Sequence, residues 1–346
     1  MKYSFKIGSA WGIPIELHIT FILLMAAVLV FSTLYFFALI MLLFVFVVVH
    51  ELSHSLVARH YNIKVRKIVL YPIGGVSEIE EIPDNPRIEW RMAGAGPLSS
   101  ILIGLFFYGL SFVTPITRVG TLYGSFTLDL ALLNLFLGAF NLIPAFPMDG
   151  GRVFRALLAE RMKYSDATKY AAFIGRVLGI IMAVVGFFYN IFLIIIGAFV
   201  YIGASEEAEQ TIVSTTMARV RVKDVMSTDV ASVKPETTLS EALETMFKAR
   251  YHDALVEKEG VFQGVVTWNE IMKAKPEQRN ELRVEQLVIR QISVFSDESI
   301  LEAYKVMTRE KIDLIPVVER ENPSKVVGVL TSEGVAYAYE KAKALR

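Results

Sequence analysis

The sequence contains no cysteine and has no formal net charge, because 35 Lys and Arg residues balance 35 Asp and Glu residues. Without cysteine the chain can form neither a disulfide nor a thiolate metal site. Without a basic excess or a long basic run, we expect no nucleic-acid partner. The first apolar run lacks a small-residue cleavage site, which favours a retained membrane span over a removed signal peptide.

Apolar residues are unevenly distributed along the 346 residues. The mean hydropathy of +0.47 is high for a soluble protein. Apolar blocks fill the chain to about Tyr201, whereas the part from Ser205 onward is rich in Glu, Lys and Arg. We therefore expect a polytopic α-helical membrane domain over residues 1–205, followed by a soluble α+β domain.

Six apolar blocks approach the length of about 20 residues that crosses a bilayer. Only a polar point at Tyr189-Asn190 separates the last two, but one helix of about 34 residues would be too long for a single crossing. The expected spans are residues 13–31, 34–59, 92–113, 127–143, 170–186 and 187–203.

Loop charges orient these spans in the membrane. With six crossings both termini lie on one side, and the loops of the other side carry only Arg118. Lys and Arg accumulate in cytoplasmic loops, so we expect both termini and the soluble domain in the cytoplasm. The positive residues on that side are Lys2, Lys6, Lys64, Arg66, Lys67, Arg87, Arg91, Arg152, Arg155, Arg161, Lys163 and Lys169.

A zinc-binding pattern, HELSH, ends the apolar run LYFFALIMLLFVFVVV. Residues four apart share a helix face, so His50 and His54 can present two nitrogens to one ion. Glu51 can take a proton from a metal-bound water, whose pKa zinc lowers to about 7. Ionisable residues in a membrane span are costly and indicate a functional site. The alternative is three polar residues at a cytoplasmic helix end.

Asp149 is the candidate third ligand, since catalytic zinc sites usually have three protein ligands. It lies in the segment 141–151, where Pro144 and Pro147 cannot continue a helix. Non-helical backbone at membrane depth is tolerated where it is buried in protein or lines a wet cavity. The alternative is an Asp that caps the helix beginning near Arg152.

These motifs together resemble the site-2 protease family of intramembrane zinc metalloproteases. The resemblance rests on HELSH near the end of an apolar helix and on NLIPAFPMDGGR about 90 residues later. Further similarities are His18, the Pro-Ile-Gly-Gly turn at residues 72–75, and Gly-Ala-Gly-Pro at residues 94–97. The resemblance covers essentially the first 205 residues.

The resemblance implies roles for individual residues. His50, His54 and Asp149 would be the ligands of one zinc ion per chain, and Glu51 would be the general base. Asn141 would hold the substrate or stabilise the oxyanion. The implied substrates are membrane-anchored single-span proteins cleaved in or near their transmembrane segments, as in regulated intramembrane proteolysis at the cell membrane.

The stretch from Val65 to about residue 80 partly alternates apolar and polar residues, with a Pro-Gly interruption. This pattern predicts a β-hairpin or edge strands beside the site. An unwound substrate could add a strand to such an edge. Gly74, Gly75 and Asn141 are therefore the candidate substrate-binding residues. The alternative is an ordinary cytoplasmic hairpin.

Two similar units, at residues 218–278 and 284–344, follow with a spacing of about 60 residues. They resemble a tandem pair of CBS domains, which implies one α+β module that often binds adenine nucleotides. Thr267, Glu270 and Thr331 are the candidate nucleotide-binding residues, but Glu270 and Gly334 replace the Asp that the family pattern expects. The alternatives are a module that forms a homodimer or one that contacts substrate.

The leading hypothesis is an intramembrane zinc endopeptidase regulated by a cytoplasmic CBS pair. A membrane transporter or channel gated by the CBS pair would also explain the spans and the soluble domain. It would not explain why Glu51 stands between two histidines at zinc-binding spacing. A third hypothesis is an inactive membrane receptor that only binds zinc.

Overall fold

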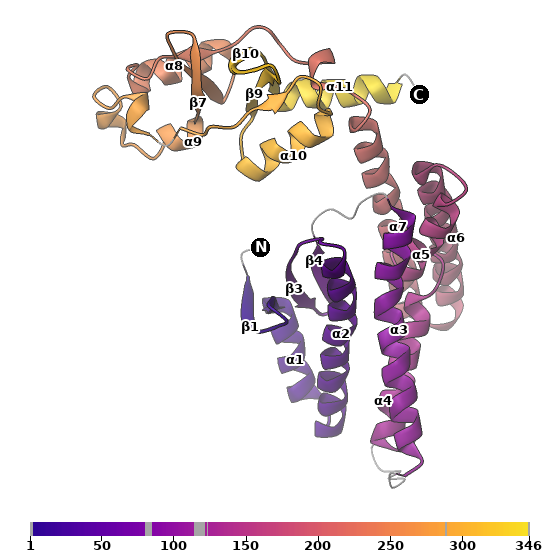
Figure 1. Cartoon of the computed structure of the whole chain (residues 1–346). Coiled ribbons are helices and arrows are strands. Elements are labelled where there is room, and N and C mark those ends of the chain that lie inside the picture. The colour runs from indigo at the N-terminus through magenta and orange to yellow at the C-terminus, as the bar shows by residue number, and fades with distance from the viewer. Residues whose placement is uncertain (1–2, 80–84, 114–121, 123, 288, 345–346) are drawn as a thin grey trace. The chain divides into compact units, whose positions relative to one another are not determined.

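The computed structural model describes residues 3–79, 85–113, 122, 124–287 and 289–344. The chain divides into two compact units, Met1–Glu209 and Gln210–Arg346 (Figure 1). Helices dominate the first unit, whereas the second combines short helices with two small sheets. The predicted combination of a helical membrane domain and an α+β domain is confirmed. Arg118, which entered the orientation argument, lies outside the described residues.

Helices of the first unit carry the apolar blocks of the sequence. By length and composition, four of its described helices, α2, α3, α6 and α7, are able to cross a membrane, while α1 and α4 are apolar but shorter. The helix α7 begins in the first unit and ends in the second. The bounds are α1 Ile19–Phe31, α2 Leu34–His60, α3 Pro86–Ser111, α4 Phe126–Asn141, α5 Asp149–Ala159, α6 Tyr164–Tyr189 and α7 Ile191–Met217.

The prediction of a first span over residues 13–31 is partly wrong, because Ile13–His18 forms the strand β2. It pairs antiparallel with β1 (Ser4–Ala10) through a turn in which Trp11 and Gly12 have positive φ. Its other edge pairs parallel with β3 (Val65–Tyr71). The sheet therefore satisfies the backbone of this segment. The helix α1 begins only at Ile19 and has 13 residues, about 20 Å against a hydrocarbon core of about 30 Å.

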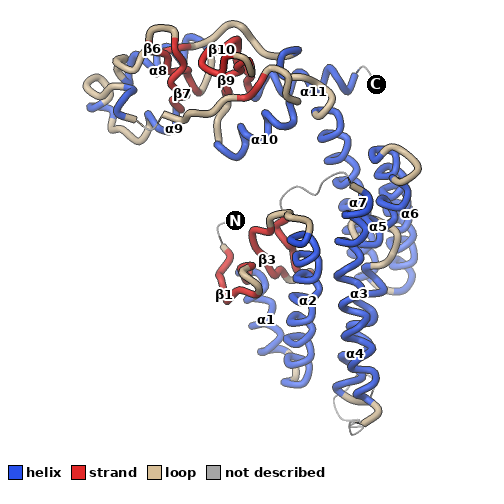
Figure 2. Tube along the Cα trace, in the orientation of Figure 1, coloured by secondary structure: helices blue, strands red, loops and turns tan. Residues whose placement is uncertain are grey.

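A four-stranded sheet in the order β1-β2-β3-β4 completes the first unit (Figure 2). The strands β3 (Val65–Tyr71) and β4 (Gly74–Ile79) form the predicted hairpin. Ile68 of β3 is fully buried and packs with Leu52 of α2, which attaches the sheet to that helix. The strand β4 is an outer strand of the sheet, with β3 as its neighbour.

The second unit is built from two repeats with the same connectivity. In each, a short strand pairs parallel with a central strand, which pairs antiparallel with a third. The first repeat comprises β5 Ser232–Val233, α8 Leu239–Ala249, β6 Asp253–Lys258, β7 Val261–Thr267 and α9 Trp268–Ile271. The second comprises β8 Val294–Phe295, α10 Ile300–Glu310, β9 Leu314–Glu319, β10 Asn322–Thr331 and α11 Ser332–Ala344.

Equivalent residues begin and end the main helix of each repeat. Thr238 caps α8 in a capping box with Glu241, and Ser299 caps α10 by accepting a backbone hydrogen bond. Arg250 and Lys311 end these helices in the left-handed conformation. The sequence repeat thus becomes a structural repeat through local capping.

Asp253, the first residue of β6, connects the two repeats. Its side chain is 3% exposed, and Oδ2 accepts hydrogen bonds from the backbone N–H groups of Asp313 (2.6 Å) and Leu314 (3.2 Å) at the start of β9. Burial raises the pKa of this carboxyl, although the two N–H donors act in the opposite direction. The hydrogen bonds therefore offset part of the cost of burying the carboxylate.

We predict that Asp253→Ala weakens the junction of the two repeats by about 1–3 kcal/mol, since two buried donors lose their acceptor. Asp253→Asn keeps an acceptor and should cost less. The control is Asp297→Ala, which removes an exposed ion pair with Arg320 and should change little. Hydrogen exchange of the β9 amides in the full-length protein measures the effect, and equal exchange in both Ala variants would contradict it.

The raised pKa of Asp253 also predicts a pH dependence. The folded state favours the protonated carboxyl of Asp253. The contribution of Asp253 to stability therefore falls as the pH rises from its ordinary pKa of 3.8 through its raised pKa in the folded protein. Asp253→Asn should remove that slope. The free energy of β9 opening, followed by hydrogen exchange against pH in wild type and variant, measures it.

Candidate metal centre

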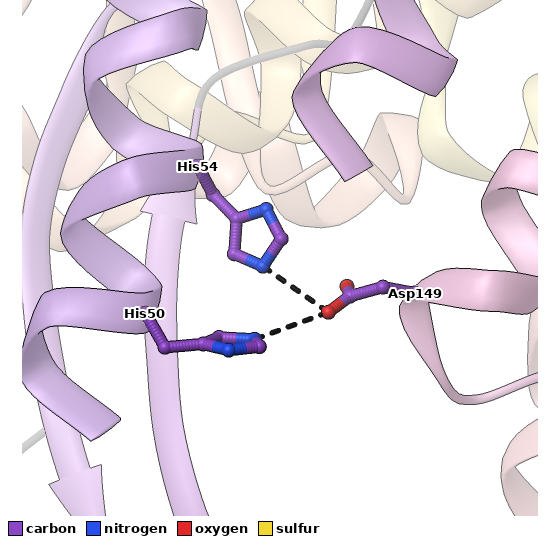
Figure 3. Close-up of side chains that lie close together, drawn as sticks. All are labelled: His50, His54 and Asp149. Carbon is purple, nitrogen blue, oxygen red and sulfur yellow. Dashed lines mark hydrogen bonds and ion pairs between the residues drawn. The ribbon is translucent and has the colours of Figure 1, made fainter. Parts of the chain in front are cut away.

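Two histidines of α2 and one aspartate of α5 meet inside the first unit (Figure 3). Nε2 of His50 lies 3.1 Å from Oδ2 of Asp149, and Nε2 of His54 lies 3.2 Å from the same oxygen. The two histidines are 4% and 8% exposed. One ligand atom of each of the three residues lies within 4.8 Å of the others. The folded chain thus assembles the triad expected from the sequence.

The other ring nitrogen of each histidine is held by α3. Nδ1 of His50 shares a 2.9 Å hydrogen bond with Oγ of Ser100, and Nδ1 of His54 lies 2.7 Å from the carbonyl oxygen of Met92. A carbonyl oxygen only accepts, so Nδ1 of His54 carries a proton. In the neutral imidazole that binds a metal, the lone pair is then on Nε2. This is the support that metal-bound histidines usually have.

The donor set fits zinc. Two imidazole nitrogens and a carboxylate oxygen are ligands of catalytic zinc sites, which keep a fourth position open. Zinc bonds of about 2.0–2.1 Å in a tetrahedron place ligand atoms about 3.3 Å apart, close to the separations of 3.1 and 3.2 Å observed here. The sequence had not indicated that Ser100 and Met92 would orient these ligands.

Gly96 of α3 faces the same two imidazoles. A Cβ atom built on Gly96 would lie 2.2 Å from Nε2 of His54 and 2.6 Å from Nε2 of His50. Such distances are shorter than any van der Waals contact, so a side chain here would displace the imidazoles. The Gly-Ala-Gly-Pro segment noted in the sequence therefore brings bare backbone against the metal site.

The start of α5 fixes the position of Asp149. Met148 occupies the N-cap without a side-chain hydrogen bond. The alternative interpretation, in which Asp149 caps the helix, is therefore wrong. The preceding segment is non-helical, and Ala145 and Phe146 within it are fully buried. A Cβ atom on Gly150 would lie 2.3–2.4 Å from backbone atoms of this segment, so the turn packs tightly against the helix it introduces.

Arg155 anchors α5 to two other helices. Its buried guanidinium binds Glu89 of α3 through Nε (2.8 Å) and Nη2, and Glu207 of α7 through Nη1 (2.9 Å). It also lies 4.9 Å from the ring centre of Phe146 and 4.8 Å from that of Tyr164. From the sequence, Arg155 is only one of several positive charges, because its acidic partners Glu89 and Glu207 are distant in the chain.

Glu51 points into the same region. Its Oε2 accepts a 2.8 Å hydrogen bond from Oγ of Ser77 on β4. The side chain lines a cavity of about 590 Å³ together with the three metal-site residues. The cavity thus joins a carboxylate to the candidate metal ligands, as a water-activating site requires.

All three candidate substrate-binding residues line this cavity. Gly74 and Gly75 belong to β4, and Asn141 is the last residue of α4. The Asn141 side chain donates to the carbonyl oxygen of Leu137 at 3.0 Å. These residues therefore share a cavity with Glu51, and their roles in binding stay a prediction.

The candidate nucleotide residues have partners within their own repeats. Oγ1 of Thr267 accepts from the backbone N–H of Glu270, and Oγ1 of Thr331 accepts from that of Gly334. The carboxylate of Glu270 accepts from Nζ of Lys273 at 2.6 Å. A nucleotide ribose would have to compete with Lys273 for Glu270.

His18 is not part of the metal cluster. It is the N-cap of α1, where its ring nitrogen accepts from the backbone N–H of Thr20, and its ring lies 4.9 Å from that of Tyr71.

Both parts of the chain match known protein families. The model of peptidase family M50 matches residues 38–127 and 117–185, and the CBS domain model matches residues 222–277 and 284–341. The chain is 38% identical over 345 residues to zinc metalloprotease MJ0392 of Methanocaldococcus jannaschii, which covers 98% of this chain and 96% of that protein. The chain belongs to peptidase family M50. It is a site-2 protease-type zinc metalloprotease with a C-terminal CBS pair.

Two further similarities cover less of this chain. The putative zinc metalloprotease Rip3 of Mycobacterium tuberculosis is 27% identical over 312 residues, 83% of this chain and 76% of that protein. The solved site-2 protease from Methanocaldococcus jannaschii is 46% identical and covers 60% of this chain and 95% of that one, with a TM-score of 0.48. The family model and the 38% identity to MJ0392 confirm the predicted family and enzyme class.

We predict that Gly96→Ala lowers zinc affinity by roughly 10–100-fold or more, because the added methyl group would displace the imidazoles. Changes that disturb ligand orientation typically have an effect of this size. The matched control is Gly94→Ala on the same helix, because a Cβ there meets nothing within 4 Å. Zinc content and chelator competition of the purified variants measure the effect. Equal zinc affinity in both variants would show that the imidazoles tolerate the methyl group.

We predict that Arg155→Met destabilises the first unit by about 3–5 kcal/mol, because Glu89 would be left buried without its cation. Arg152→Ala is the control, since its ion pair with Glu207 is long at 3.7 Å and half-exposed. Thermal unfolding in detergent measures both variants. A small loss in Arg155→Met would mean that water reaches Glu89.

Proposed function

We propose that this protein is an intramembrane zinc endopeptidase that hydrolyses peptide bonds in or near the transmembrane segments of single-span membrane proteins. One observation carries the proposal: the carboxylate of Glu51 shares a cavity with the triad His50, His54 and Asp149 in a helical membrane domain. Membership of peptidase family M50 supports the same reaction.

The proposed chemistry assigns a role to each residue of the cavity. Zinc held by His50, His54 and Asp149 would polarise the scissile carbonyl and lower the pKa of the attacking water. Glu51 takes the proton of that water and returns it to the nitrogen of the leaving amine. Asn141 holds the substrate or donates a hydrogen bond to the developing oxyanion.

Substrate access follows from the position of β4. The amides of a transmembrane helix are engaged in their own hydrogen bonds, so the helix must unwind before one carbonyl can be attacked. An extended segment can replace those hydrogen bonds by adding to the outer strand β4, whose residues Gly74 and Gly75 line the cavity. We propose that Gly74, Gly75 and Asn141 contact the substrate in this way.

The CBS pair supplies the regulatory part of the proposal. The positive loop residues support a cytoplasmic location for both termini and for the CBS pair. We propose that an adenine nucleotide or a second copy of the chain acts on this module. Isothermal titration of the full-length protein with AMP and ATP, beside a Thr267→Ala variant, separates the two. Heat of binding that is lost in the variant supports the nucleotide, and a dimer without such heat supports the second copy.

Cleavage of a panel of single-span substrates by the purified protein in detergent tests the protease proposal. Glu51→Gln should lower kcat by about 10²–10⁴-fold, the usual contribution of general acid–base catalysis, while zinc content stays the same. The control is Glu78→Gln on β4, a carboxylate that forms an ion pair with Lys67 and should leave kcat unchanged.

The outcomes separate the competing hypotheses. Cleavage by wild type and the control but not by Glu51→Gln, with equal zinc in all three, supports the protease. Zinc without cleavage of any substrate would favour a receptor that only binds metal. Absence of zinc from the wild type would contradict the site itself.

A further inference from the structure

A chain of two hydroxyl groups leads to Glu51. Ser55 lies one turn after Glu51 on α2 and is fully buried, and its Oγ donates to Oγ of Ser77 on β4 at 3.2 Å. Oγ of Ser77 in turn donates to Oε2 of Glu51 at 2.8 Å. Figure 1 shows β4 against the C-terminal part of α2. The strand that borders the cavity therefore holds the carboxylate of that helix.

The direction of these hydrogen bonds is determined by their chemistry. A serine hydroxyl has one proton and two acceptor lone pairs. When Ser77 accepts from Ser55, its own proton is left for Glu51, whose Oε2 lies at 2.8 Å and whose backbone carbonyl oxygen lies farther away at 3.3 Å. The shorter hydrogen bond goes to the carboxylate, and such chained hydrogen bonds strengthen one another. The second oxygen of the carboxylate, Oε1, is then available for proton transfer.

The backbone of β4 restricts the same side chain from another direction. A Cβ atom on Gly75 would lie 2.4 Å from Cγ and 3.2 Å from Cδ of Glu51, so bare backbone packs against the stem of the glutamate. A glutamate side chain loses substantial rotamer entropy when it is fixed. The contact with Gly75 and the hydrogen bond from Ser77 together select one rotamer before substrate arrives.

We propose that Ser77 is a positioning residue that orients the general base Glu51. The inference rests on the proposed protease function and extends it to a residue outside the two main motifs. The orientation of the base thereby depends on β4, the strand proposed to pair with the substrate.

Ser77→Ala in the full-length protein tests the proposal. Loss of the hydroxyl should lower kcat by roughly 10–100-fold, the effect of a hydrogen bond to a charged group, with KM within twofold and zinc content unchanged. Ser77→Thr retains a hydroxyl on a residue favoured in strands and should restore kcat. The matched control is Ser53→Ala on α2, whose hydroxyl donates instead to the carbonyl oxygen of Val49.

A double variant separates positioning from a general structural effect. Glu51→Asp shortens the side chain by one methylene and withdraws it from Ser77, so Ser77→Ala should have little further effect in that background. Ser55→Ala, which removes the first donor of the chain, should lower kcat by a smaller factor than Ser77→Ala. This variant also provides a test if Ser77→Ala does not fold.

The outcomes are distinct from those of the protease proposal. Wild-type kcat in folded Ser77→Ala or Ser55→Ala would overturn the positioning role while leaving the protease intact. Loss of zinc in Ser77→Ala without rescue by Thr would also overturn it, in favour of a structural role. A zinc-loaded wild type that cleaves no substrate would instead overturn the protease function.

Discussion

The contact of one carboxylate with two imidazoles organises the first unit. Asp149 belongs to a segment far along the chain from His50 and His54, and it can reach them only if α5 begins at the right depth and angle. The tight turn before α5 and the ion pairs of Arg155 serve this purpose. The position of the triad therefore depends on contacts that α3 makes with the two histidines and that Arg155 of α5 makes with α3 and α7.

The helix α3 has the largest share in this support. Ser100 and Met92 of α3 hold the Nδ1 atoms of both imidazoles. Gly96 of the same helix lies against their Nε2 atoms, and Glu89 binds Arg155. None of these residues is expected to ligate the ion. Their common effect is that the imidazoles are fixed without the metal, so little reorganisation accompanies its binding.

The sequence predicted those features that depend on local spacing or local chemistry. The spacing of His50 and His54, the proline break before Asp149 and the repeat of the second unit all follow from short-range rules. The strand at residues 13–18 was missed because an apolar run alone cannot distinguish a helix from a strand. Its partners β1 and β3 decide the matter.

The supports of the site were missed for a related reason. The hydrogen bond from Ser77 to Glu51 and the ion pair of Arg155 with Glu89 join residues that are distant in the chain. A serine at a hairpin or a glutamate at a helix start has many ordinary explanations. Only the packing of the elements distinguishes these residues from surface ones.

The separation of 99 residues between His50 and Asp149 has a thermodynamic consequence. An ion bound by both residues closes a chain loop, and closing a loop of that length in a flexible chain costs roughly 4 kcal/mol of entropy. A bound ion is thus a cross-link between two distant parts of the polypeptide as well as a source of reactivity. Zinc availability would then influence how much of the protein is folded, in addition to how much of it is active.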